Sequence, residues 1–400
     1  MRLQVSALGN DAAASWATRN DKCNIVKLRR GCKSIEELEK GLQVILAEKG
    51  VSRRDFLKFC SFMAATLVLP STYVPKIAQA LAAAKRPPLL WLEYQDCAGC
   101  TESFLRAHNP TVAELVLDVL SVNYHETIMA PSGKGAEASL KATISEGGYI
   151  TIVEGAIPTK DDGIYCCIGG RTALDLMQEV ASRSAAIITV GACAFYGGWP
   201  ATPPNPTGAK GVQDVVSGVP IINLPGCPLN VDNLTATVVH YLTFGSLPAV
   251  DGLKRPLFAY GRRIHDNCER RGHFDAGEFV RAWGDEGHRK GWCLYQMGCK
   301  GPVAFQNCPT IRWNAGTSWP VGAGHGCIAC AANNFWERPT YEAIPIHELT
   351  PPTTYPATQA APTGLSPLAA GVIGAAVGVA VTAAGAVAVQ QLTKESPKEE

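Results

Sequence analysis

The segment LLWLEYQDCAGC, residues 89–100, decides the fold, because an apolar run as long as a strand ends just before a Cys-x-x-Cys pair. Two later apolar runs, 186–190 and 219–224, are each followed by another cysteine. In an open parallel sheet, the carboxyl ends of the strands share one edge, and ligands bind in the crevice there. The thiols expected to meet at this edge belong to Cys97, Cys100, Cys193 and Cys227. Such a set would hold an iron-sulfur cluster or a structural zinc ion.

Strand-like and helical segments alternate between residues 88 and 247, which predicts a parallel sheet covered by helices. Helices are expected at 103–120, 171–182 and 229–241, and a further strand at 149–157. After Pro256 this pattern fades, and Gly, Pro, Trp and Cys become dense. The sequence therefore predicts an α/β domain followed by a loop-rich domain that is loose without metal.

The loop-rich part contains two further sets of candidate ligands, which are more than a single zinc site would need. One set offers one nitrogen and three sulfurs, and the other offers three sulfurs. They are His265, Cys268, Cys293 and Cys299, and Cys308, Cys327 and Cys330. A second and a third cluster are expected from these sets. His325 is expected to be structural rather than a ligand. Cys166 and Cys167 are expected to be a pair of buried, apolar residues, and a reactive thiol or a disulfide is the alternative.

The chain has 400 residues, fifteen cysteines and a formal charge of +1. This balance points to neither a nucleic-acid partner nor an acidic surface. A disulfide framework in an exported protein is the main alternative use of the cysteines. The close Cys-x-x-Cys spacings, and a chain long enough to build a core without cross-links, argue against it.

The segment Ser52 to Lys58, SRRDFLK, has the pattern of a twin-arginine export signal. An apolar run at 59–69 and the small residues Ala80, Ala82, Ala83 and Ala84 follow it, as expected for a signal that is cleaved. Proteins that use this route generally fold and take up their cofactors before export. The signal and the metal ligands therefore support the same interpretation.

The stretch 368–389 has no charge, and it is long enough to cross a bilayer core, which needs roughly 20 apolar residues. A proline-rich stretch, 351–367, precedes it and is expected to be an extended tether. A buried or surface-lying helix is the alternative. Lys394 and Lys398 beyond the span favour a cytoplasmic C-terminus.

Taken together, the motifs resemble the small subunit of nickel-iron hydrogenases over nearly the whole chain. The order and spacing of the motifs carry the resemblance, and no single one would suffice. Besides the export signal, they are Cys97-x-x-Cys100-Thr-Glu-Ser, Gly191-x-Cys193, Pro225-Gly-Cys-Pro228, His265-x-x-Cys268-Glu-Arg-Arg, Gly291-Trp-Cys293, Gly298-Cys-Lys-Gly-Pro302, Asn307-Cys-Pro309, Trp319-Pro-Val321 and Gly324-His-Gly-Cys-Ile-Ala-Cys330.

The resemblance implies three clusters and assigns a ligand set to each. It implies a proximal 4Fe-4S cluster on Cys97, Cys100, Cys193 and Cys227, a distal 4Fe-4S cluster on His265, Cys268, Cys293 and Cys299, and a medial 3Fe-4S cluster on Cys308, Cys327 and Cys330. Pro320 stands where a fourth medial cysteine would otherwise be expected, and proline offers no ligand. A neutral imidazole in place of one thiolate raises the potential of the distal cluster.

The resemblance also implies a division of the chain. The expected parts are a removed signal region (1–84), a flavodoxin-like domain with the proximal cluster (85–250), a domain with the medial and distal clusters (251–350), the tether (351–367), a transmembrane helix (368–389) and a cytoplasmic tail (390–400).

In this family the nickel-iron centre belongs to a separate large subunit, so the chain is expected to relay electrons and to contain no catalytic residue. The expected path runs from hydrogen oxidation in the large subunit, through the three clusters, to a membrane cytochrome b or another quinone-linked subunit. The complex is expected at the periplasmic face of the cytoplasmic membrane, as one heterodimer or a pair of them. The alternative is a related iron-sulfur subunit of a respiratory complex without hydrogenase activity, which would lack the His265 and Cys308 sets. A zinc-stabilised structural protein is a third class.

Two further positions carry expectations about chemistry near the proximal cluster. Oxygen-tolerant members of the family have extra cysteines where this chain has Gly99 and Gly198, so an ordinary, not oxygen-tolerant, enzyme is expected. Glu102 is expected to form a buried hydrogen bond or to serve as a proton exit at the subunit interface.

Overall fold

The computed structural model describes residues 53–83, 87–108, 121–333 and 335–337. The chain divides into two units, Met1–Leu349 and Thr350–Glu400, and every described residue belongs to the first. The expected tether, transmembrane helix and tail lie outside the described residues. Within the described part, no helix is long and apolar enough to span a membrane.

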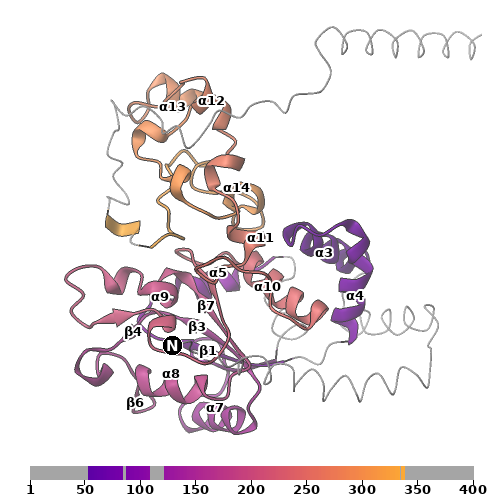
Figure 1. The fold of residues 1–400 in the computed structure, drawn as a ribbon, viewed down its shortest axis with the longest axis vertical. Helices are drawn as coiled ribbons and strands as arrows, with labels where there is room; N and C mark the ends of the chain where they lie inside the picture. The colour runs from indigo at the N-terminus through magenta and orange to yellow at the C-terminus, as the bar shows by residue number, and fades with distance from the viewer. Residues whose placement is uncertain (1–52, 84–86, 109–120, 334, 338–400) are drawn as a thin grey trace, which may run out of the picture. The chain divides into compact units, whose positions relative to one another are not determined.

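A five-stranded parallel sheet forms the centre of the first half of the chain (Figure 1). Its strands are β1 (Pro88–Glu93), β2 (Ser121–His125), β3 (Ile150–Glu154), β7 (Ala186–Val190) and β9 (Ile221–Leu224). They lie in the order β2-β1-β3-β7-β9, which is the order of flavodoxin-like sheets. Every residue of β3, β7 and β9 is buried, as expected for strands covered by helices on both faces. The predicted parallel α/β domain is confirmed.

Helices cover the two faces of this sheet, and alternate residues of β1 point to opposite faces. Leu89 and Trp91 join one apolar cluster, with residues of α5 and α10. Leu90 and Leu92 join another, with residues of α7 and α8. The helices are α5 (Gly99–Leu105), α7 (Lys134–Glu146), α8 (Ala173–Ala181), α9 (Gly191–Tyr196) and α10 (Val231–Phe244). Side chains of Thr172 and Asn230 cap α8 and α10 by accepting hydrogen bonds from backbone N–H groups.

One prediction about these helices was wrong. A helix was expected at 103–120, but α5 begins earlier and ends at Leu105, with Arg106 as its C-cap. Residues 109–120 lie outside the described part.

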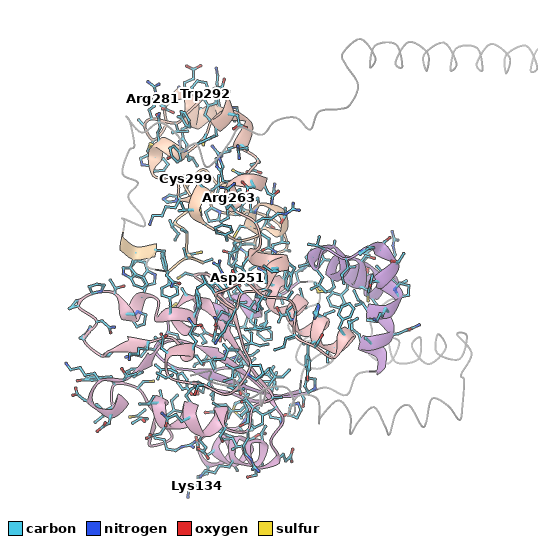
Figure 2. The ribbon with its side chains drawn as sticks, in the orientation of Figure 1. Lys134, Asp251, Arg263, Arg281, Trp292 and Cys299 are labelled. Atoms are coloured by element: carbon cyan, nitrogen blue, oxygen red, sulfur yellow. The ribbon has the colours of Figure 1, made fainter. Side chains whose placement is uncertain are left out.

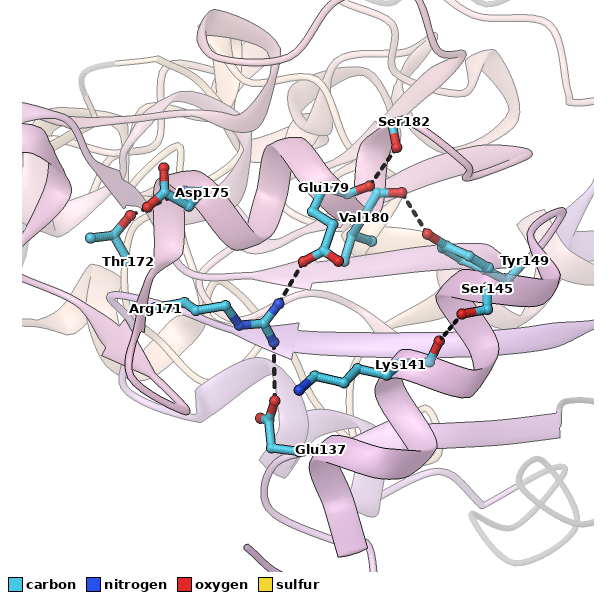
Figure 3. A network of polar contacts seen from close by, with 10 residues as sticks. All are labelled: Glu137, Lys141, Ser145, Tyr149, Arg171, Thr172, Asp175, Glu179, Val180 and Ser182. Carbon is cyan, nitrogen blue, oxygen red and sulfur yellow. Dashed lines mark hydrogen bonds and ion pairs between the residues drawn. The ribbon is translucent and has the colours of Figure 1, made fainter. Parts of the chain in front are cut away.

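Polar contacts join α7 and α8 on one side of the sheet (Figure 3). The Arg171 guanidinium contacts Glu137 of α7 at 3.1 Å and Glu179 of α8 at 2.5 Å. The Tyr149 hydroxyl donates to the Val180 carbonyl at 2.7 Å. Arg171 thus links two helices that are far apart in sequence.

Two short antiparallel pairs and several single turns complete this domain. The pairs are β4 (Ile157–Pro158) with β8 (Ala209–Lys210), and β5 (Cys167–Ile168) with β6 (Arg171–Thr172). The turns are η3 (Lys160–Gly163), η4 (Trp199–Ala201) and η5 (Val212–Asp214).

Residues 257–333, called the cluster region below, contain only short helices and turns in the described chain. These are α11 (Leu257–Tyr260), η6 (Ile264–Asn267), α12 (Arg271–Asp275), α13 (Glu286–Lys290), η7 (Tyr295–Met297), η8 (Gly301–Val303) and α14 (Cys308–Ile311), followed by η9 (Phe335–Glu337). Their apolar cluster includes the thiols of Cys308 and Cys327 beside Leu294 and Val321. The cluster region is loop-rich, as the sequence predicts, and cysteines are part of its core.

Two helices precede the sheet, α3 (Arg53–Thr66) and α4 (Val74–Ala83), joined by η1 (Ser71–Tyr73). Both pack on α10 and share an apolar cluster with it (Figure 1).

Candidate metal centres

The first predicted set of cysteines lies at the carboxyl edge of the sheet. Cys97 and Cys100 follow β1, Cys193 lies in α9 after β7, and Cys227 follows β9. Burial, together with the neighbouring thiols of Cys227 and Cys97, raises the pKa of Cys193 to about 12. The pKa of Cys100 is raised well above its usual value by burial first, with added contributions from Glu154, Cys193 and Cys227. The structure therefore brings these four thiols together.

Glycines make room for these sulfurs. A Cβ atom on Gly191, at φ +83°, would lie 2.5 Å from the Cys100 sulfur. One on Gly198 would lie 2.6 Å from the Cys193 sulfur, whereas one on Gly99 would lie 3.1 Å from the Cys97 sulfur. At Gly191 and Gly198 the backbone approaches the cysteine sulfurs more closely than a residue with a Cβ atom would allow. A cluster held by four thiolates fits this set of donors.

Glu154 at the end of β3 holds the Cys97–Cys100 loop, and sequence reasoning missed it. Its carboxylate accepts hydrogen bonds from the backbone N–H groups of Cys100 and Thr101, both at 2.9 Å, and from the Thr101 hydroxyl at 2.7 Å. Burial raises its pKa to about 7, although these hydrogen bonds lower it. The available signal was a carboxylate ending an apolar strand, which is costly unless it is paired.

The second set, His265, Cys268, Cys293 and Cys299, lines one pocket of the cluster region. Burial, together with the neighbouring thiols of Cys299 and Cys268, raises the pKa of Cys293 to about 12. Burial lowers the pKa of His265 to about 4, so its imidazole is neutral at physiological pH. A neutral imidazole and three sulfurs are suitable ligands for a transition metal or an iron-sulfur cluster. Figure 2 shows Cys299 and Trp292 in this region.

The third set, Cys308, Cys327 and Cys330, is buried beside the second. Burial raises the pKa of Cys327, and Cys299, Cys330 and Cys308 raise it further. Pro320 is exposed, and its carbonyl oxygen accepts a hydrogen bond from the N–H of His325 at 2.9 Å. The three thiols therefore lie close enough to affect one another's pKa.

The three sets form a row, with the third between the other two. The Cys327 N–H donates to the Cys299 sulfur at 3.2 Å, which joins the third set to the second. The backbone of Cys227 is hydrogen-bonded to the Cys330 thiol, and the Cys227 thiol raises the pKa of Cys330. This joins the third set to the first.

In the parts of the chain that the structure describes, no three His, Cys, Asp or Glu side chains converge closely enough to hold a single metal ion. The members of each set lie near one another, and all but the exposed Cys97 are buried or half-buried, but they do not share one coordination point.

The remaining candidates lie elsewhere. Cys166 is half-buried and Cys167 is exposed on the β5–β6 hairpin, and both are free thiols. The His325 ring stacks on Trp283, with its Nδ1 2.8 Å from the Gly326 carbonyl oxygen. Glu102 is exposed and pairs with Arg106 at 2.7 Å, so in this chain Glu154, and not Glu102, is the buried carboxylate beside the first set.

Two family models match the chain. The model of the NADH ubiquinone oxidoreductase 20 kDa subunit matches residues 97–241, and that of the C-terminal part of the NiFe/NiFeSe hydrogenase small subunit matches residues 260–341. The first covers the sheet domain, and the second covers the cluster region.

Curated relatives and solved structures agree with the second model. The periplasmic NiFe hydrogenase small subunit 1 of Nitratidesulfovibrio vulgaris is 48% identical over 310 residues, which cover 76% of this chain and 98% of the relative. The hydrogenase-2 small chain of Escherichia coli K12 is 42% identical over 364 residues, 90% of this chain and 98% of the relative. The structure of the NiFeSe hydrogenase of Desulfomicrobium baculatum gives a TM-score of 0.61 at 35% identity, covering 65% of this chain and all (100%) of that chain.

Proposed function

Because the chain belongs to the family of nickel-iron hydrogenase small subunits, we propose that it relays electrons from a hydrogen-oxidising large subunit, through three iron-sulfur clusters, to a quinone-linked acceptor in the membrane. Small subunits of this family carry iron-sulfur clusters and pair with a large subunit, which holds the nickel-iron site. Iron-sulfur clusters accept and release electrons at potentials set by their ligands and surroundings. The row of three neighbouring thiol sets, whose members are buried or half-buried except for the exposed Cys97, is the observation that carries the proposal.

We assign one cluster to each set. Cys97, Cys100, Cys193 and Cys227 hold the proximal 4Fe-4S cluster, His265, Cys268, Cys293 and Cys299 hold the distal 4Fe-4S cluster, and Cys308, Cys327 and Cys330 hold the medial 3Fe-4S cluster. The mutual effects of the thiols on their pKa values support each grouping. Thiols whose pKa is raised by burial hold their protons until a metal replaces them, so cluster binding releases protons here.

Hydrogen bonds within this chain hold the loops and sulfurs of the proposed ligands in place. Glu154 fixes the loop of Cys97 and Cys100 through two backbone N–H groups. The Leu229 N–H donates to the Cys100 sulfur at 3.4 Å, the Arg270 N–H to the Cys268 sulfur at 3.4 Å, and the Ala329 N–H to the Cys327 sulfur at 3.3 Å. Hydrogen bonds to ligand sulfurs are one means by which a protein sets a cluster's potential.

The membrane side of the proposal rests on sequence and on one relative. The quinone-reactive Ni/Fe-hydrogenase small chain of Wolinella succinogenes is 47% identical over 297 residues, which cover 73% of this chain. With the twin-arginine pattern at 52–58 and the apolar stretch 368–389, it supports a periplasmic subunit anchored beside a cytochrome b or another quinone-linked partner. Both heterodimers and pairs of heterodimers fit these features.

We further propose that the enzyme is of the ordinary, oxygen-sensitive type. Gly99 and Gly198 lie beside the sulfurs of Cys97 and Cys193, and neither glycine offers a ligand. Aerobic hydrogen oxidation at a rate comparable to that under nitrogen would contradict this part.

The test is anaerobic co-purification from membranes, followed by iron, nickel and hydrogen-dependent dye reduction in one sample. We expect nickel, about eleven irons from this chain's three clusters, and hydrogen-dependent reduction. Iron without nickel or hydrogen activity would instead support a related iron-sulfur subunit of a respiratory complex, whose 20 kDa subunit model matches residues 97–241.

A matched pair of substitutions tests the ligand assignment. Cys327→Ser removes a proposed medial ligand, and we expect loss of the 3Fe-4S electron paramagnetic resonance signal and at least about a tenfold fall in dye reduction. Cys167→Ser, on the exposed hairpin, serves as the control and should change neither. An unchanged medial signal in Cys327→Ser would refute the assignment.

A further inference from the structure

A helical hairpin formed by α3 and α4 covers one face of α10 (Figure 1). Cys60, Met63 and Ile77 of this hairpin are 0% exposed. The shared apolar cluster consists of Phe59, Cys60, Met63, Ala64, Leu67, Ile77, Ala78, Ala236 and Val239. A helix lying free in water would leave such side chains exposed, so the contact is a packed interface.

The turn between the two helices adds a second contact, at the end of α10. The Tyr73 and Phe244 rings lie 5.9 Å apart between centroids, and the Lys76 ammonium lies 4.7 Å from the Phe244 centroid. An ammonium over an aromatic ring is attracted to its face. The turn and the start of α4 therefore also contact α10, at its C-terminal end.

The docked face is also the face that an export signal needs. The apolar run at 59–69 is the part of such a signal that inserts into the membrane, and its residues Phe59, Cys60, Met63 and Leu67 are buried against α10. A side chain cannot be buried in both places. The small residues expected at the cleavage site, 80–83, lie in the last turn of α4, and a protease acts on a segment only after it opens.

We propose that the α3–α4 hairpin is an autoinhibitory contact of the uncleaved chain, which withholds the apolar run of the export signal while it is docked on α10. The opposite face of α10, with Leu234 and Val238, packs in the core of the sheet domain. The docking face therefore exists only after that domain has folded, and the hairpin detaches when the export machinery takes hold of it. This inference rests on the proposed role of residues 52–69 in export.

The reactivity of Cys60 tests the docking in the full-length chain. A twin-lysine variant, Arg53→Lys with Arg54→Lys, keeps the chain in the cytoplasm, and iodoacetamide labelling is followed peptide by peptide. We expect Cys60 to react at least about tenfold more slowly than the exposed Cys167, because buried groups react only through local opening. Burial also raises the pKa of Cys60, to about 12, which slows the reaction further. Equal rates at the two cysteines would overturn the proposal.

A substitution on α10 tests the inhibition and leaves the signal itself intact. Ala236→Asp places a charge in the docking face, and Ala142→Asp, at an exposed position of α7, is the matched control. We expect Ala236→Asp to raise Cys60 labelling toward the rate of Cys167 and, with both arginines present, to raise the rate of export. The control should do neither. Iron content equal to that of the control shows that the sheet domain has folded.

Two other outcomes are informative. Cys60 that stays protected in Ala236→Asp, or an export rate that does not change when Cys60 is released, would overturn the proposal. Export that continues in the twin-lysine variant would instead refute the twin-arginine signal, and the labelling comparison would still decide whether the hairpin docks.

Discussion

The sheet domain and the cluster region both surround thiols that we propose as cluster ligands, but the surroundings are built differently. In the sheet domain the ligand loops follow strands whose apolar side chains form two clusters of their own. In the cluster region, ligand thiols such as Cys308 and Cys327 are themselves members of the apolar cluster, and helices have four or five residues. In the sheet domain one candidate ligand, Cys100, joins a core that is built mainly by strands and helices. In the cluster region Cys308 and Cys327 are part of a core that is surrounded by short helices and turns.

Removing the clusters should produce the largest difference between the two regions. After anaerobic extraction of iron with a chelator, we expect amide hydrogen exchange in the cluster region to rise by about a hundredfold or more, since metal binding there contributes to folding. Strands β3 and β7 should stay protected, because their burial depends on side chains alone. Hydrogen exchange read by mass spectrometry checks this, and equal loss of protection in both regions would show that the two fold as one unit.

Two glycines beside the first set sharpen the comparison within the sheet domain. Gly198→Ala places a Cβ 2.6 Å from the backbone and sulfur of Cys193, at φ +48°, and should cost at least about half of the proximal cluster's occupancy. Gly99→Ala is the matched control, because its Cβ would lie 3.1 Å from its nearest neighbour, the Cys97 sulfur. This variant should lose much less of the cluster's occupancy. Iron content and the proximal cluster's spectrum measure both. Similar losses in the two variants would mean that crowding at Gly198 is relieved by local movement.

The energetic coupling between the two regions can be measured at one pair of side-chain amides. The Asn233 amide donates to Asn307 at 3.0 Å, and Asn307 donates back at 2.9 Å, which joins α10 to the residue before Cys308. We expect Asn233→Ala and Asn307→Ala each to lower the free energy of unfolding by about 1–3 kcal/mol, since each leaves a polar group unpaired. The double variant should cost less than the sum, and a double-mutant cycle by denaturant unfolding checks this. Full additivity would show that the regions are not coupled here.

The smallest expected effect is a pH dependence confined to the sheet domain. Burial raises the pKa of Glu126 to about 8 from an ordinary value of 4.5. The folded state then binds the proton more tightly, so this residue's contribution to stability is present below about pH 4.5 and is lost as the pH rises to about 8. Glu126→Gln should shrink the fall in Tm between pH 5 and pH 8 by about 2–4 °C, and the exposed Glu146→Gln should not. Thermal unfolding at both values measures it, and an unchanged fall would show that Glu126 is ionised throughout.

The sequence predicts the sheet well, because continuous apolar runs are a strong local signal. The run 186–190 coincides with β7, and 219–224 contains β9. The helix expected at 171–182 is α8, two residues shorter at its start. By contrast, β2 and α7 were not predicted. For β2 the reason is that it alternates polar and apolar residues, and only its last two residues are buried.

The site was predictable as far as its ligands, but not as far as their supports. The spacing of the cysteines predicts three sets, and the members of each set lie near one another in the structure, although no three of them converge on one point in the described residues. Their role as ligands stays a prediction. Glu154 could not be found in this way, because its role depends on β3 lying beside β1, so that a carboxylate 54 positions away meets the Cys100 N–H. Parallel pairing across such a separation leaves no local pattern in the sequence.

The hydrogen bond from Cys327 to the Cys299 sulfur limits how the relay can vary. One peptide group belongs both to a ligand of one proposed cluster and to the surroundings of its neighbour. A change in the turn at 326–328 would therefore move two redox couples at once, and a gain at one can be cancelled at the other. A Cβ on Gly326 would lie 3.0 Å from the Cys299 backbone, so even small residues disturb both. Adaptation to a new electron acceptor would then be easier from residues on the outer side of the distal set, where a single couple changes alone.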